Sequence, residues 1–320
     1  MTTRTMNLSI RFRYFGYTVV GIAILFSVAR TDWVDTLRVN LYAHSVVDVG
    51  FSTPDINLQH TDLTPQMPNT EQGVRWSIFD AVLRQDYSRA VVDLQKYMDI
   101  ADDEQKTRIL YWITQQSQQL AGQGDEKHAL SVLAVSKSWL DFQQYNLNLG
   151  TIYSLLGDLS RAIEFYEQSI TLQATPEALL NLAKVYTVLA KQSTADDYHL
   201  AQKYYETASM HIVEAIHLDA SFQPEGDLLL GDVYWKMNRR TDSVEAYLRV
   251  TEDRDNSISA AFAWYYLGNI YAYWWADAVD YRLARSYFER AYAVAPDAQF
   301  RLIVLSAIAD VDSRLDQEKE

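Results

Sequence analysis

Apolar residues recur at helical spacing along much of the chain, and the pattern is most regular in residues 261–298. The first half of this stretch places four residues on one face of a predicted helix: Trp264, Leu267, Gly268 and Tyr271. The second half has another helically spaced set: Ala284, Phe288, Ala291 and Pro296. Small residues allow two helices to approach closely, and large residues fill the space beside them. The pattern therefore predicts a pair of packed antiparallel helices.

These residues resemble the tetratricopeptide repeat, whose pattern is Trp-x2-Leu-Gly-x2-Tyr, then Ala-x3-Phe, then Pro. Related units are indicated at 143–175, 176–223 and 224–260, and residues 71–142 keep the pattern in degenerate form. The resemblance implies an all-α fold, a right-handed superhelical solenoid of antiparallel helix pairs. Residues 299–320 are expected to supply a capping helix and an acidic tail that close the array.

The unit at 176–223 is longer than a standard repeat. Residues 196–220 read as one continuous helix, which predicts that the insertion lengthens the second helix of the unit. Two registers stay open for the apolar face of that helix. One uses Ala208, Ile212 and Ala215, and the other uses Ala201, Tyr205 and Ala208.

The N-terminal segment, residues 1–30, is expected to be a membrane anchor or a signal segment. Residues 14–29 are uncharged and mostly apolar, and a helix extended to residue 34 has about the 20 residues that a bilayer span needs. The alternative is a cleaved signal peptide, because Ser27 and Ala29 offer small residues for a peptidase. Both readings keep the arginine-containing leader in the cytoplasm and export the rest, to the periplasm or another extracytoplasmic space.

Residues 31–70 show no sustained period. Half of the chain's prolines fall there: Pro54, Pro65 and Pro68. This composition favours extended and turn conformations with little to bury. The segment is predicted to be a linker that holds the repeats away from a membrane, or else an irregular cap on the first repeat.

The amino-acid composition excludes several kinds of binding partner and active site. A hydrophobic content of 48% predicts a folded core, and a formal net charge of −14 argues against a nucleic-acid partner, which needs clustered Lys and Arg. The absence of cysteine excludes disulfides, thiolate metal sites and a cysteine nucleophile. His211, Glu214 and His217 share one side of a helix, but no second half-site has matching spacing, so a solvated face is the preferred reading. We therefore expect no metal, no cofactor and no enzyme activity.

The resemblance also implies a binding surface. In this repeat family the first helices line a concave groove that holds a peptide or a partner helix. Residues of this chain at the groove-facing places are Lys184, Asp232, Trp235, Lys236, Phe262, Tyr265, Tyr266, Asn269 and Tyr273. Aromatic side chains are common anchors of protein interfaces. Each aromatic could instead pack against the closing helix or the loop at 274–281.

Together these features predict a single-pass, membrane-anchored scaffold without catalytic activity. It would contact the lipid bilayer through residues 14–34 and hold another protein, or a membrane protein complex, in the concave groove. It could be a permanent accessory subunit or a visiting assembly factor. The alternative is a soluble exported receptor for a peptide or small ligand, which would require signal cleavage.

Overall fold

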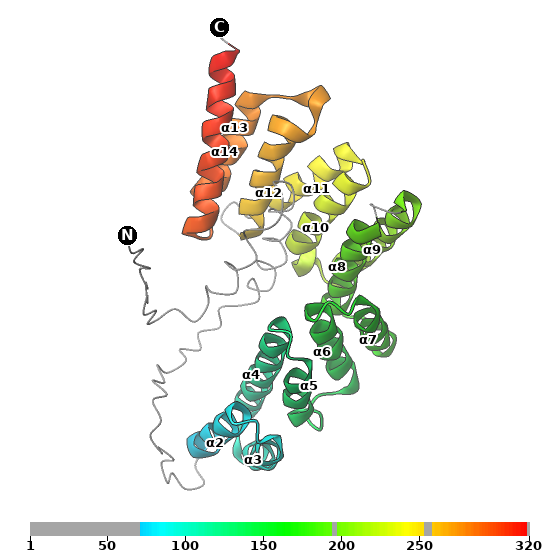
Figure 1. Cartoon of the computed structure of the whole chain (residues 1–320), viewed down its shortest axis with the longest axis vertical. Coiled ribbons are helices and arrows are strands. Elements are labelled where there is room, and N and C mark those ends of the chain that lie inside the picture. Colours follow the sequence, from blue (N-terminus) through cyan, green and yellow to red (C-terminus); the bar gives the residue numbers. More distant parts are fainter. Residues whose placement is uncertain (1–70, 194–196, 253–257, 319–320) are drawn as a thin grey trace, which may run out of the picture. The chain divides into compact units, whose positions relative to one another are not determined.

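The computed structural model describes residues 71–193, 197–252 and 258–318 (Figure 1). Within these ranges the chain forms thirteen α-helices and no strand. The first six are α2 (Glu71–Leu83), α3 (Tyr87–Ile100), α4 (Asp103–Gly122), α5 (Glu126–Val135), α6 (Phe142–Leu155) and α7 (Leu159–Leu172). The next four are α8 (Pro176–Ser193), α9 (Tyr198–Leu218), α10 (Gln223–Lys236) and α11 (Arg240–Glu252). The last three are α12 (Ile258–Asn269), α13 (Tyr281–Ala293) and α14 (Ala298–Gln317).

Consecutive helices pack as pairs, and each pair packs on the next. The pairs are α2–α3, α4–α5, α6–α7, α8–α9, α10–α11 and α12–α13, and α14 packs on α13. The prediction of an all-α helical repeat solenoid is therefore confirmed. Its right-handed superhelical sense stays a prediction.

No helix in the described ranges is long and apolar enough to cross a membrane. The predicted anchor at 14–34 and the predicted linker at 31–70 lie outside the described residues. The bilayer contact and the export of the repeat region therefore stay predictions.

Short turns join α4 to α5 and α6 to α7, and the sequence explains where the second helix of each pair begins. Gly124 and Gly157 adopt φ values of 81° and 79°, a left-handed conformation that glycine reaches without steric cost. An aspartate follows each glycine, and its side chain accepts a hydrogen bond from the backbone N–H three residues on. Such N-caps satisfy one of the unpaired donors at the start of a helix. The Gly-Asp pairs thus fix the turns before α5 and α7.

A close contact between a glycine and an aromatic ring recurs in three pairs. A Cβ added to Gly150 would lie 2.6 Å from the ring of Tyr166, and one added to Gly231 would lie 2.4 Å from that of Tyr247. At Gly268 the corresponding distance, to the ring of Phe288, is 2.5 Å. Only glycine lets the two helices approach this closely.

The insertion at 176–223 lengthens α9 into one continuous helix, as predicted. Residues of both proposed registers are buried on its inner face: Ala201, Tyr205, Ala208, Ile212 and Ala215. They pack in one cluster with Leu179, Leu180 and Ala183 of α8. The two registers are thus one extended apolar stripe, and the additional turns bury additional surface.

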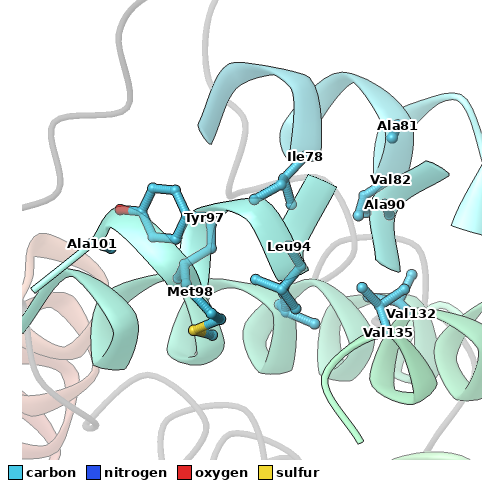
Figure 2. Close-up of a cluster of buried hydrophobic side chains, with 12 residues drawn as sticks. Ile78, Ala81, Val82, Ala90, Leu94, Tyr97, Met98, Ala101, Val132 and Val135 are labelled. Carbon is cyan, nitrogen blue, oxygen red and sulfur yellow. The ribbon is translucent and has the colours of Figure 1, made fainter. Parts of the chain in front are cut away.

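The degenerate repeats at 71–142 also form packed helix pairs. Their core contains Ile78 of α2, Leu94, Tyr97 and Met98 of α3, and Val132 and Val135 of α5 (Figure 2). The buried apolar residues elsewhere form further clusters under neighbouring helices. The described chain is thus held together by a series of local cores between adjacent pairs.

Candidate interaction surface

The predicted groove residues on α12 are largely buried. Tyr265 is 9% exposed, Tyr266 4% and Asn269 8%, and Phe262 is half-buried. The expectation that they line an open groove is wrong, because neighbouring elements cover them. Phe262 and Tyr265 pack against the closing helix, which was the alternative reading. Tyr266 packs instead on α11 and on Trp274, and Asn269 donates a hydrogen bond to the backbone carbonyl of Tyr265.

An aromatic network provides this cover. The ring of Phe300, on the closing helix α14, lies 4.7 Å from that of Phe262 and 5.6 Å from that of Tyr265. The ring of Tyr266 lies 5.4 Å from Tyr247 of α11. Edge-to-face and tilted ring pairs at such separations are favourable beyond their buried area. These side chains therefore hold α11, α12 and α14 together and leave little surface for a partner.

Two of the predicted charged residues, Lys184 and Asp232, form ion pairs between α8 and α10. Lys184 Nζ of α8 lies 2.8 Å from Glu225 Oε1 of α10. Asp232 Oδ2 of α10 lies 3.6 Å from Lys191 Nζ of α8, and Asp232 is 9% exposed. Sequence reasoning named one member of each pair and missed the other. The ion pairs could not be predicted because the sequence does not show that α8 and α10, the first helices of successive pairs, lie side by side.

On α10, the accessible residues of the predicted set lie at the C-terminal end of the helix. Trp235 is half-buried and Lys236 is exposed. The ring of Trp235 lies 5.7 Å from that of Trp274, and the guanidinium of Arg240 lies 5.9 Å from the Trp235 ring. Asp277 Oδ2 lies 3.8 Å from Arg240 Nη1. We call these five residues the Trp235 surface.

The segment between α12 and α13 shapes this surface. After Asn269 the helix widens into a π-helical turn, η2 (Ile270–Trp274), followed by a short 3-10 turn, η3 (Ala276–Ala278). The π-turn presents Trp274 to Trp235, and the 3-10 turn presents Asp277 to Arg240. Sequence reasoning placed neither residue in the site. The unusually long link and its adjacent tryptophans, Trp274 and Trp275, were the available signal.

Tyr273, the last predicted groove residue, is 36% exposed and contacts the closing helix. Its hydroxyl donates a 2.8 Å hydrogen bond to Asp310 Oδ2, and the guanidinium of Arg314 lies 5.3 Å from its ring. Burial and the neighbouring carboxylate raise the pKa of the Tyr273 hydroxyl. The hydroxyl therefore stays a neutral donor and ties η2 to α14.

The histidine cluster on α9 behaves as a helix surface. His211 stacks on Tyr186 with ring centroids 6.0 Å apart, and its Nδ1 lies 4.0 Å from Glu214 Oε2. Burial lowers the pKa of His211. Across the described part of the chain, no three His, Cys, Asp or Glu side chains are grouped to hold a metal ion.

Comparison with known protein families gives one match. The sequence profile of the tetratricopeptide repeat matches residues 143–176, the segment that forms α6 and α7. Residues 143–176 are thus similar to a tetratricopeptide repeat. No curated protein matches the chain in sequence.

Two solved structures show the same fold. Human IFIT1, in a dimer with PPP-AAAA, is 11% identical with a TM-score of 0.58, over 79% of this chain and 58% of IFIT1. TTC0263, a thermophilic TPR protein of Thermus thermophilus, is 19% identical with a TM-score of 0.50, over 62% of this chain and 99% of TTC0263. At such identities the likeness shows the fold alone. This chain spans less than two thirds of IFIT1.

Proposed function

We propose that this protein is a non-catalytic scaffold that binds another protein through the Trp235 surface. The observation that carries the proposal is the pair of partly accessible tryptophans, Trp235 and Trp274, with the guanidinium of Arg240 5.9 Å from the Trp235 ring. Lys236, the residue after Trp235, adds an exposed positive charge. Tryptophan and arginine are the side chains most enriched among the residues that dominate binding energy at protein interfaces. The helical repeats support the proposal, because solenoids of this kind present extended binding surfaces.

The finer form of the proposal is an exported adaptor anchored in a membrane by residues 14–34. It would act as an accessory subunit or assembly factor of a membrane protein complex. Its support is the apolar run at 14–29, which follows Arg11 and Arg13. Basic residues next to a hydrophobic segment favour retention of that end in the cytoplasm.

The test is affinity purification of the tagged full chain from detergent-solubilised native membranes, followed by mass spectrometry. Wild type is compared with Trp235→Ala, Lys236→Glu and the matched control Lys203→Glu, which reverses an exposed charge on α9. We expect a stoichiometric partner that both Trp235-surface variants lose and the control keeps. Peptides from residues 1–29 in the purified protein would support a retained anchor. A partner kept equally by all variants, or no partner, would refute the proposed surface.

An RNA is the competing partner, because the IFIT1 structure with a similar fold holds PPP-AAAA. The formal net charge of −14 argues against it, since phosphate binding depends on clustered Lys and Arg. Fluorescence anisotropy with labelled PPP-AAAA, at low and physiological salt, separates the two. If PPP-AAAA binds in a salt-dependent way and Lys236→Glu weakens that binding, the proposed partner is RNA and not a protein.

A further inference from the structure

Two adjacent residues of the π-turn η2 contact different parts of the array. Tyr273 contacts the closing helix α14, because its hydroxyl donates a 2.8 Å hydrogen bond to Asp310 Oδ2. Trp274 contacts α10 instead, with its ring 5.7 Å from that of Trp235. One peptide bond joins Tyr273 to Trp274, so a displacement of one residue is transmitted to the other. The closing helix is thereby connected to the Trp235 surface.

The contact with α14 is built around one carboxylate. Arg314 Nε donates a second 2.8 Å hydrogen bond to Asp310 Oδ2, and the guanidinium of Arg314 lies 5.3 Å from the centre of the Tyr273 ring. Hydrogen bonds that involve an ionised partner are stronger than neutral ones. The Tyr273 side chain is therefore held at its hydroxyl by Asp310 and at its ring by Arg314.

The tryptophan on the other side of the turn has less support of its own. Trp274 is half-buried, and its neighbours among the described aromatic rings are Trp235 and Tyr266. The position of such a ring depends on how firmly the turn that carries it is held. π-Turns are rare and occur often at functional sites. A side-chain contact that fixes η2 is thus well placed to fix Trp274.

We propose that the contact of Tyr273 with Asp310 and Arg314 positions Trp274, so that docking of α14 and binding at the Trp235 surface favour one another. The closing helix then shapes the binding surface in addition to covering the end of the array. The effect on binding rests on the function proposed above, whereas the positioning of Trp274 concerns this chain alone.

The contact that carries the coupling also limits its size. A conformational equilibrium can change binding only by the free-energy difference between its two states. The side chains of Asp310 and Arg314 are about half exposed, so the contact is worth no more than an ordinary hydrogen bond. Its loss should therefore weaken binding at the Trp235 surface by about tenfold at most.

Fluorine NMR of the full chain labelled with fluorotryptophan reports on Trp274 without any partner. The chain has eight tryptophans, and Trp274→Phe identifies the resonance of Trp274. The test variant is Asp310→Ala. The matched control is Asp312→Ala, which removes a carboxylate of the same helix that pairs with Arg285 of α13 at 2.6 Å. We expect the Trp274 resonance to shift and broaden in Asp310→Ala and to keep its wild-type position in Asp312→Ala.

A conservative variant separates positioning from a general loss of structure. Asp310→Asn keeps an acceptor oxygen for the Tyr273 hydroxyl, so it should return the Trp274 resonance most of the way to its wild-type position. Equal shifts in Asp310→Ala and Asp312→Ala would mean that any loosening of α14 moves Trp274, and would overturn the proposal. An unmoved resonance in Asp310→Ala would also overturn it, because the buried residues Ile270 and Ala272 would then fix η2 by themselves.

Affinity purification with the same two variants tests the effect on binding. Asp310→Ala should retain less of the partner captured by wild type than Asp312→Ala does. A partner kept equally by both variants would refute the coupling. If the Trp274 resonance shifts as expected but wild type captures no partner, the proposed function fails and the positioning of Trp274 stands. A partner that Trp235→Ala loses, together with an unmoved Trp274 resonance in Asp310→Ala, would refute the positioning alone.

Discussion

Replacing Gly231 with alanine gives a direct measure of how tightly the helices of a pair are packed. The added Cβ would lie 2.4 to 2.6 Å from three ring carbons of Tyr247. Carbon atoms in van der Waals contact are about 3.5–4.0 Å apart, so the ring must move by about 1 Å or more. Tyr247 is fully buried, and it also contacts the ring of Tyr266. A shift of the Tyr247 ring would therefore also displace Tyr266 on α12.

Two opposing terms set the size of the effect. Overpacking a well-filled core costs about 1–3 kcal/mol, and the large displacement places this site near the upper end. Alanine is favoured over glycine inside a helix by about 1 kcal/mol. We expect a net destabilisation of about 2 kcal/mol, equivalent to a decrease in melting temperature of about 3 °C for a chain of this size.

The assay is urea denaturation followed by circular dichroism, with Gly122→Ala as the control. Gly122 ends α4, and an added Cβ there meets nothing within 4 Å. The control should be neutral or slightly stabilising, because only the helix-propensity gain remains. Adding Tyr247→Leu to Gly231→Ala should make the double variant more stable than the sum of the two single changes predicts. A Gly231→Ala variant as stable as wild type would refute the close-packing argument.

Three further substitutions test other parts of the structure. Burial alone would raise the pKa of Asp93, but hydrogen bonds from Ser77 and Lys96 and the charges of Lys96 and Arg89 lower it. The ionised Asp93 side chain therefore stabilises the folded state, and this contribution is lost as pH falls through the lowered pKa. Melting curves from pH 7 to pH 3 should therefore show a smaller acid-induced loss for Asp93→Asn than for wild type, and equal losses would contradict this account. Tyr265→Ala should lower stability by about 3 kcal/mol in urea denaturation, because the ring packs on Phe288 and Phe300, and an unchanged midpoint would return Tyr265 to the binding surface. Gly157→Ala should cost about 1 kcal/mol in the same assay, because alanine is strained at φ 79°, and a stabilising effect would show that the turn adjusts freely.

The sequence was sufficient to predict the helix pairs, because their packing depends on small and large residues at fixed spacing. Gly231 and Tyr247 illustrate this, since each stands at its own place in the repeat and the two meet in the structure. The continuous α9 was predictable for the same reason: an unbroken apolar stripe needs an unbroken helix.

The candidate site was only partly predictable. Periodicity places Tyr265 and Trp235 on comparable faces of their helices, but it does not say which neighbouring element covers each face. Phe300 of α14 covers Tyr265, and no comparable side chain buries Trp235 among the residues that the structure describes. The π-turn that brings Trp274 to Trp235 follows from packing between two units and has no period of its own in the sequence.

The division of the core into local clusters has a consequence for how the chain opens. Each helix pair is supported mainly by its neighbours, so the end units can unfold while the middle of the array stays intact. Amide hydrogen exchange should then vary along the chain, with faster exchange toward α2 and slower exchange in the interior pairs. A protein bound at the Trp235 surface would slow exchange in α10, α11 and α12 and leave α2 and α3 unchanged. The position of a bound partner could thus be read from the helices whose exchange it slows.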